Sequence, residues 1–135
     1  MLELLVVAVG GGVGAAARFM VDGEVRVRHN GGFPWGTFVV NVTGSFLIGL
    51  FVTLSFTLFR LGVPGDTASL LHLALVTGLC GGYTTFSTST VESVRLAQSG
   101  RMRLALANSL GTLMVTVTAA GLGFWLGTAV SGAFG

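Results

Sequence analysis

The chain has 135 residues, of which 52% are hydrophobic and only 9% are charged, and its formal net charge is +2. Because soluble domains carry about 25% charged residues, this composition excludes a soluble globular protein and indicates one integral membrane domain, residues 1–135. All seven basic residues are arginines that form no run, which excludes a nucleic-acid surface, and a single cysteine excludes an internal disulfide.

Four apolar segments follow one another, over residues 4–21, 35–59, 69–91 and 104–130. A helix needs about 20 residues to cross a bilayer, so we expect an all-α membrane fold with four transmembrane helices. Short loops join them at residues 22–34, 60–68 and 92–103. No basic stretch precedes the first segment, so we expect it to be retained as a helix rather than removed as a signal peptide. Pairs of glycines four residues apart predict close helix packing.

The loop arginines predict an orientation. The first and third loops hold five arginines and the second loop holds one: Arg26, Arg28, Arg95, Arg101 and Arg103 against Arg60. Short cytoplasmic loops are enriched in basic residues. We therefore expect the first and third loops in the cytoplasm and, since the number of helices is even, both termini outside.

Two polar side chains lie inside the first two segments. Arg18 is the only arginine well inside an apolar segment. It either extends to the membrane interface or lies at the floor of an aqueous vestibule, where it attracts anions. Asn41 is costly in hydrocarbon unless it is bonded, so it is either a helix–helix bond or a donor that lines a pore.

The third segment carries the most informative motif, Gly-Leu-Cys-Gly-Gly-Tyr-Thr-Thr-Phe-Ser-Thr at residues 78–88. It places three glycines and several hydroxyl groups at the centre of a run that has no formal charge. Lipid cannot satisfy freed backbone groups, so a broken helix is tolerated only where it lines a cavity or an ion site. We expect the third helix to be broken at its centre. Phe86 within it either packs in the core or turns its electropositive ring edge toward an anion.

The fourth segment carries Asn108, Thr112 and Thr116 at spacings of four residues. This spacing places all three on one helix face. Threonine hydroxyls often bond to the preceding turn of their own helix, which requires no function. Three polar groups in register, with an asparagine first, favour a hydrophilic track.

Several chemistries have no residues to support them. No carboxylate lies in the middle of a segment, which disfavours a proton-coupled exporter of cationic compounds. No His/Asp pair is placed to activate a serine, and no cluster of His, Cys or acidic residues has metal-ligand spacing. The sequence therefore predicts a protein that is not an enzyme.

These motifs together resemble the Fluc/CrcB family of fluoride channels. The resemblance covers nearly the whole chain: residues 11–18, then 36–41, then 81–88, with Glu92 in step. It implies a dual-topology dimer of two antiparallel four-helix subunits in the bacterial inner membrane, with two narrow fluoride pathways along the subunit interface. Fluoride, membrane lipid and a second subunit are the partners that it implies.

The resemblance also implies roles for particular residues. Backbone carbonyls of the helix break hold a structural Na⁺, and by motif position they belong to Gly81 and Thr84. Asn41 matches the family's pore asparagine, and Phe86 matches the first of two pore phenylalanines. The family's polar track falls at Thr112 and Thr116, with Asn108 one turn earlier. We expect the fluoride pathway to comprise Arg18, Asn41, Phe86, Ser89, Asn108, Thr112 and Thr116.

The chain departs from the family at the second pore phenylalanine, where it has Ser89. This change alters, widens or closes the pathway that uses the residue. Combined with the uneven loop arginines, it raises the alternative that this subunit pairs with an oppositely oriented homologue, as a non-conducting or half-functional member of a heterodimer. A small dual-topology multidrug exporter is a further alternative, disfavoured by the missing carboxylate.

Overall fold

The structure, a computed structural model, describes residues 1–29 and 31–132 of the chain. Over this range it consists of four long helical spans: α1 (Leu2–Arg28), α2 (Trp35–Arg60), a third span over Gly65–Gln98 and a fourth over Met102–Gly132. All four are long and apolar enough to cross a membrane. The predicted all-α fold with four membrane helices is confirmed.

The third and fourth spans are composite. The third contains α3 (Gly65–His72), the π-helix η1 (Leu73–Cys80), α4 (Gly81–Tyr83) and α5 (Phe86–Gln98), and the fourth contains α6 (Met102–Leu106), the π-helix η2 (Ala107–Gly111) and α7 (Thr112–Gly132). Between α4 and α5 two residues are not helical. The predicted break near the middle of the third span is therefore confirmed. π-Helical turns are rare and frequently lie at functional sites.

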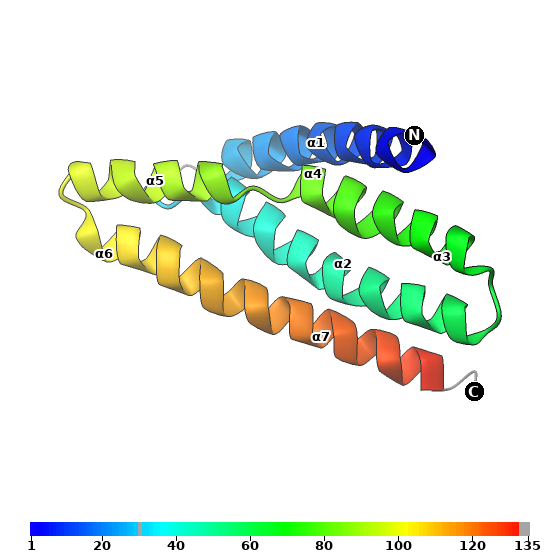
Figure 1. The fold of residues 1–135 in the computed structure, drawn as a ribbon. Coiled ribbons are helices and arrows are strands. Elements are labelled where there is room, and N and C mark those ends of the chain that lie inside the picture. Colours follow the sequence, from blue (N-terminus) through cyan, green and yellow to red (C-terminus); the bar gives the residue numbers. More distant parts are fainter. Residues whose placement is uncertain (30, 133–135) are drawn as a thin grey trace.

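The helix α2 lies in the middle of the bundle (Figure 1). It packs along α7 on one side and against α1 and η1 on the other, while α1 also packs on η1 and α4. The start of α1, the end of α7 and the connection from α2 to α3 lie at one end of the bundle. The connections from α1 to α2 and from α5 to α6 lie at the opposite end, which is the arrangement that an even number of spans requires.

The helices approach closely through glycine. Gly49 of α2 lies against the Ala120 backbone, and Gly123 of α7 lies against the Phe46 carbonyl, so a Cβ at either position would collide with main chain. The predicted close packing is confirmed at the glycine pairs of α1, η1, α4 and α7, each of which faces a neighbouring helix within 3 Å of the added Cβ: Gly10, Gly14, Gly78, Gly82, Gly123 and Gly127. In lipid such packing replaces the hydrophobic effect as the force between helices.

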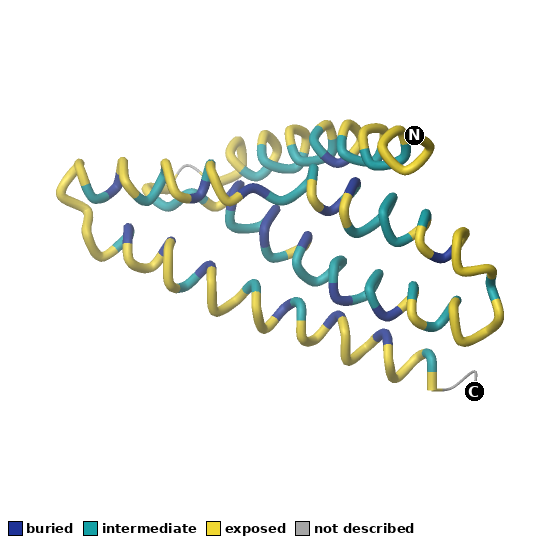
Figure 2. Tube along the Cα trace, viewed as in Figure 1, coloured by how far each residue is buried: buried dark blue, intermediate teal, exposed yellow. Residues whose placement is uncertain are grey.

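The described residues are buried in a pattern opposite to that of a soluble protein, with apolar residues outside and polar residues inside (Figure 2). Large apolar side chains are exposed along the outer faces of α1 and α7, where lipid would surround them. The buried set is small and includes seven polar residues: Thr37, Asn41, Thr53, Thr85, Ser89, Asn108 and Thr112. A bundle that encloses polar groups in a membrane points to an internal polar function.

The first helix extends seven residues beyond the predicted end at residue 21. Its last two turns are supported by two ion pairs at the i, i+4 spacing. Asp22 and Arg26 approach to 2.8 Å, and Glu24 and Arg28 to 2.7 Å. Charged residues therefore continue the helix past the apolar segment, and the first loop is shorter than the sequence suggested.

Candidate ion pathway

The third span is unwound at Thr84 and Thr85. Thr84 has φ −78° and ψ 157°, and Thr85 has φ −147° and ψ 116°, so both residues are extended. Extended backbone inside a membrane needs protein partners for its N–H and C=O groups. The break also leaves the first N–H groups of α5 without helical acceptors. Thr85 Oγ1 accepts a hydrogen bond from the Thr88 N–H at 3.3 Å and so caps α5.

Asn41 supplies the other partners. Its Nδ2 donates to the Thr85 carbonyl at 2.9 Å, and its Oδ1 accepts from the Thr85 N–H at 2.8 Å. Asn41 is buried, with 8% of its surface exposed. The carboxamide therefore satisfies both backbone groups of the unwound residue, and the two bonds also fix which side of the amide is oxygen.

The break releases two carbonyl oxygens from helical bonding. In a continuous helix the Thr85 N–H would bond to Gly81 O, and the Thr88 N–H would bond to Thr84 O. Both donors instead bond to side-chain oxygens. Thr84 O accepts one long bond, of 3.4 Å, from Arg18 Nη1. These two carbonyls are the ones to which the family resemblance assigns sodium.

The released carbonyls fit a hard cation. Within residues 1–29 and 31–132, no three His, Cys, Asp or Glu side chains gather as a metal site. Carbonyl oxygens at unwound helices suit Na⁺. Gly81 is exposed and Thr84 is half-buried.

A groove of about 530 Å³ lies beside the break, between α2, α5 and the fourth span. It brings together five of the predicted pathway residues: Asn41, Phe86, Ser89, Thr112 and Thr116. Its wall carries further hydroxyl groups, from Ser45, Thr84, Thr85, Thr90, Ser93 and Ser109. The structure thus assembles a hydroxyl-rich groove within apolar spans.

Asn108 lies behind the wall of this groove. It is fully buried, and its Nδ2 donates to the Ser89 carbonyl at 3.1 Å and to Ser93 Oγ at 2.8 Å. It does not line the groove, whereas Thr112 and Thr116 do. Asn108 and Thr112 are both buried, one turn apart, on the inner face of the fourth span. Ser93, which the sequence did not single out, accepts a hydrogen bond from Asn108 there.

Phe86 is the first residue of α5, and 86% of its surface is exposed. An exposed ring beside a polar groove is typical of a surface that a partner covers. Phe86 therefore lies where the groove opens to the surface of the bundle.

Arg18 lies in a separate cavity of about 310 Å³ that shares Thr85 with the groove. Asp22 and Thr37 line the same cavity. The Thr37 hydroxyl oxygen is buried and has no partner among the described residues. Arg18 is therefore on the other side of the break from the hydroxyl groove, where its guanidinium approaches the Thr84 carbonyl.

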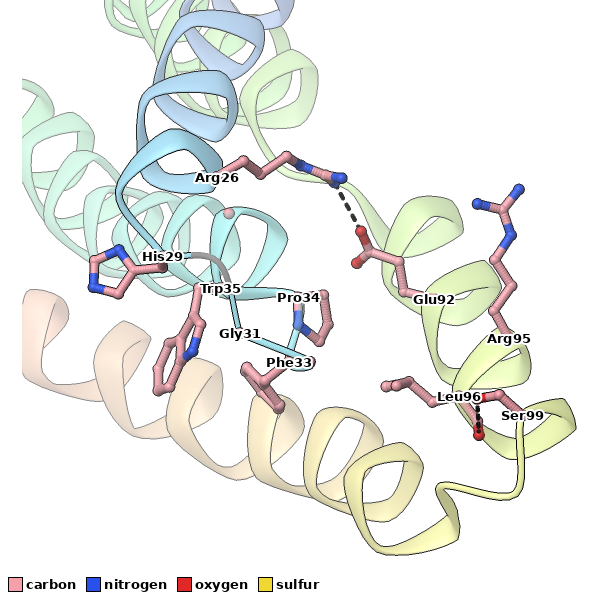
Figure 3. A pocket seen from close by; sticks show the side chains of 12 residues that line it. Arg26, His29, Gly31, Phe33, Pro34, Trp35, Glu92, Arg95, Leu96 and Ser99 are labelled. Carbon is pink, nitrogen blue, oxygen red and sulfur yellow. Dashed lines mark hydrogen bonds and ion pairs between the residues drawn. The ribbon is translucent and has the colours of Figure 1, made fainter.

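The arginine-rich end of the bundle holds a third cavity, of about 550 Å³ (Figure 3). Arg26 of α1 reaches across to Glu92 of α5, with Nη2 and Oε1 at 2.8 Å, while its Nε pairs with Asp22. Arg95 also lines this cavity. The i, i+4 spacing of Asp22 and Arg26 was readable from the sequence, but the contact with Glu92 depends on how α1 and α5 pack.

These features define the class of protein as an ion-conducting membrane protein. Four membrane spans enclose an unwound helix, released carbonyls and a hydroxyl-lined groove, and irregular backbone at this depth is typical of ion-conducting membrane proteins.

Comparison with known proteins places the chain more closely. It belongs to the family described as "CrcB-like protein, Camphor Resistance (CrcB)", whose pattern matches residues 5–124. A relative from Leifsonia xyli subsp. xyli, "Fluoride-specific ion channel FluC 1", is 46% identical over 126 residues, covering 93% of this chain and 87% of the relative. A protein of the same name from Frankia casuarinae is 43% identical over 133 residues, covering 97% and 100%. "Fluoride-specific ion channel FluC" from Magnetococcus marinus is 44% identical over 128 residues, covering 93% and 98%. The family is one of ion channels and not of enzymes.

Proposed function

We propose that this chain is a subunit of a fluoride-selective ion channel that passively releases cytoplasmic fluoride. The observation that carries the proposal is the hydroxyl groove beside the break that Asn41 braces. The names of its relatives support it, since each is a fluoride-specific ion channel.

The groove suits fluoride for a physical reason. A small anion holds its water strongly, so a pathway must replace that water with hydrogen-bond donors. Groove hydroxyls that make no bond within the described residues, such as those of Ser45 and Ser89, supply donors, and the ring edge of Phe86 is electropositive. A narrow pathway excludes larger halides. In acidic surroundings neutral HF enters the cell and ionises, and the channel lets the anion leave.

The open side of the groove supports a dimer. Lipid cannot satisfy the hydroxyl groups that line it, and the exposed Phe86 ring marks the side that needs a cover. We assign this cover to a second subunit in the opposite orientation. The released carbonyls of Gly81 and Thr84 would then hold a structural Na⁺ between the subunits, and Na⁺ would supply positive charge that holds the two breaks together.

A second candidate is a heterodimer in which this chain is one of two different subunits. Ser89, which stands where the family has a ring, and the five-to-one arginine bias of the loops favour it. In that assembly the pathway that passes Ser89 differs from the pathway that passes the partner's corresponding residue.

The deciding experiment is fluoride efflux from liposomes that contain only this purified chain, with chloride efflux measured alongside. Fast efflux of fluoride without chloride supports a self-sufficient channel. If folded, monodisperse protein gives no fluoride efflux, the homodimer proposal fails. Efflux that returns only when an oppositely oriented homologue is co-expressed then supports the heterodimer.

A further inference from the structure

The third cavity lies outside the ion pathway that we propose. It holds about 550 Å³ at the arginine-rich end of the bundle, between the connection from α1 to α2 and the second half of α5 (Figure 3). Among the described residues, it shares no lining side chain with the hydroxyl groove or with the cavity of Arg18. A ligand of this cavity would therefore contact residues other than those of the pathway.

All three carboxylates at this end of the bundle form ion pairs. Asp22 and Glu92 pair with Arg26, and Glu24 pairs with Arg28. The same end carries five arginines, so three of them form no ion pair with any described residue: Arg95, Arg101 and Arg103. Cationic groups that have no acidic partner attract anions from outside the protein.

Two of these three arginines adjoin the cavity. Arg95 lines it from α5. Arg101 packs its guanidinium on Gly32, which lines the cavity from the other side, so closely that a Cβ at residue 32 would collide with it. Gly32 and Phe33 both line the cavity, and their N–H groups donate no hydrogen bond to the described residues. The cavity therefore adjoins two guanidinium groups, which suit the oxygens of a phosphate.

Glu92 does not oppose an anion beside these arginines. Its Oε1 pairs with Arg26 at 2.8 Å, and only 14% of its side chain is exposed. Because α5 runs outward from the break, Glu92 also lies deeper than Arg95 and Ser99. The neutralised pair of Arg26 and Glu92 is at the inner end of the cavity, and the unpaired arginines are nearer its outer end.

Aromatic side chains place this cavity at the depth of lipid headgroups. Trp35 is the first residue of α2, and its ring packs against Phe33 and Phe38 at centroid distances of 4.8 Å and 5.8 Å. Tryptophan at the end of a membrane span commonly lies at the interface between headgroups and acyl chains. Phe33 and Leu96 face one another across the cavity (Figure 3). The cavity therefore combines adjoining cationic groups with an apolar lining, which suits an amphiphilic ligand.

We propose that the third cavity binds the phosphate group of an anionic phospholipid, with the guanidinium groups of Arg95 and Arg101 as its ligands. Basic pockets between membrane helices are a recurring type of site for anionic headgroups. A lipid fits better than free phosphate, because the aromatic side chains and Leu96 give the site an apolar part that only a lipid can use. The inference does not depend on fluoride conduction.

The test compares three ligands of the purified full-length protein in a neutral detergent. Phosphatidylglycerol carries an anionic headgroup, phosphatidylcholine has the same acyl chains and no net charge, and inorganic phosphate has no chains. A ligand that binds the folded state raises the midpoint of thermal unfolding. Phosphatidylglycerol should raise the midpoint more than either of the others, at about 150 mM salt, which screens exposed charges that do not touch the ligand.

Variants then locate the site. The double variant Arg95→Gln/Arg101→Gln should weaken phosphatidylglycerol binding by about tenfold or more, because each change removes hydrogen bonds to a charged group. Arg103→Gln is the matched control, since it removes the same charge from an exposed arginine that does not line the cavity, and it should bind as wild type. Gly32→Ala keeps the net charge but displaces the Arg101 guanidinium, so it should also weaken binding. It provides a reading if the double variant fails to fold.

The outcomes separate a built site from general surface charge. An equal loss for Arg103→Gln and for the double variant overturns the proposal, as does wild-type affinity in the double variant or in Gly32→Ala. Equal stabilisation by phosphatidylcholine or by inorganic phosphate overturns the assignment to an anionic lipid. Phosphatidylglycerol binding by wild-type protein that gives no fluoride efflux supports this site and counts only against the proposed function.

Discussion

Asn41 of α2 and Thr85 at the helix break are joined by two hydrogen bonds, of 2.9 Å and 2.8 Å, although 44 residues separate them. A carboxamide has the same donor and acceptor as a peptide group. Asn41 therefore stands in for the helical neighbours that Thr85 has lost, and it connects the second span to the break. The same contact places Asn41 beside the hydroxyl groove.

We predict that Asn41→Ala destabilises the protein and abolishes most fluoride efflux. The change leaves the Thr85 N–H and C=O unpaired, at a cost of about 1–3 kcal/mol for each group. Thermal unfolding in detergent measures the first effect, and liposome efflux measures the second. Ser45→Ala, one turn further along α2, is the control for stability because Ser45 makes no bond to the break. An Asn41→Ala protein as stable as wild type contradicts the bracing role.

Glycine packing gives a second prediction, on the contact between α2 and α7. A methyl at Gly123 would collide with the Phe46 carbonyl, whereas a methyl at Gly121 meets nothing within 4 Å. Gly123→Ala should therefore lower the free energy of unfolding by about 1–3 kcal/mol. Gly121→Ala should be neutral or slightly stabilising, since alanine favours a helix. Equal unfolding midpoints for the two variants, in a titration with denaturing detergent, are the result that this packing does not allow.

The four spans could be predicted because their signal is local. Long apolar runs identify membrane helices without knowledge of their neighbours, and glycines spaced by four indicated close packing. The ends of the helices were harder to predict from the sequence. Asp22 and Glu24 mark a loop by composition, yet their pairing with Arg26 and Arg28 keeps α1 helical to Arg28.

Five of the predicted pathway residues line one groove, but their arrangement could not be predicted from the sequence. The glycines suggested where the third span would unwind, but Gly78 and Gly82 are helical and pack against α1, and the unwound residues are Thr84 and Thr85. The reason is a distant partner: the break lies where Asn41 can satisfy it. Likewise, a spacing of four placed Asn108 and Thr112 on one face, and both are buried there, but the bonds of Asn108 to Ser89 and Ser93 depend on how α5 and the fourth span pack.

Orientation in the membrane gives a third prediction. Leu61 and Ser99 lie at opposite ends of the bundle, in the connections after α2 and after α5. In a Cys80→Ala background, Leu61→Cys and Ser99→Cys are labelled in intact cells with a membrane-impermeant thiol reagent. A subunit that inserts both ways should be labelled at each position, in roughly half of the molecules. The arginine bias instead predicts labelling at residue 61 and protection at residue 99.

The labelling also bears on the partner. Labelling at both positions is what an antiparallel homodimer requires. Labelling at residue 61 alone means that every copy points the same way, so an antiparallel dimer would need a different chain as its second subunit. Labelling at residue 99 alone contradicts the orientation that the arginines predict. Complete labelling of both residues after the cells are permeabilised is the control for access.

Sodium dependence gives the last prediction. The carbonyls of Gly81 and Thr84 lack helical donors because the Thr85 and Thr88 N–H groups bond elsewhere. If they hold Na⁺ between two subunits, replacing Na⁺ by N-methylglucamine on both sides at constant ionic strength should reduce efflux and shift the protein toward monomer. Thr84→Val keeps its carbonyl and is the matched control, so it should show the same sodium dependence as wild type. Equal efflux and equal dimer fraction without sodium would mean that the released carbonyls bind no structural cation. Sodium dependence that disappears in Thr84→Val would instead assign the cation to the hydroxyl of that residue.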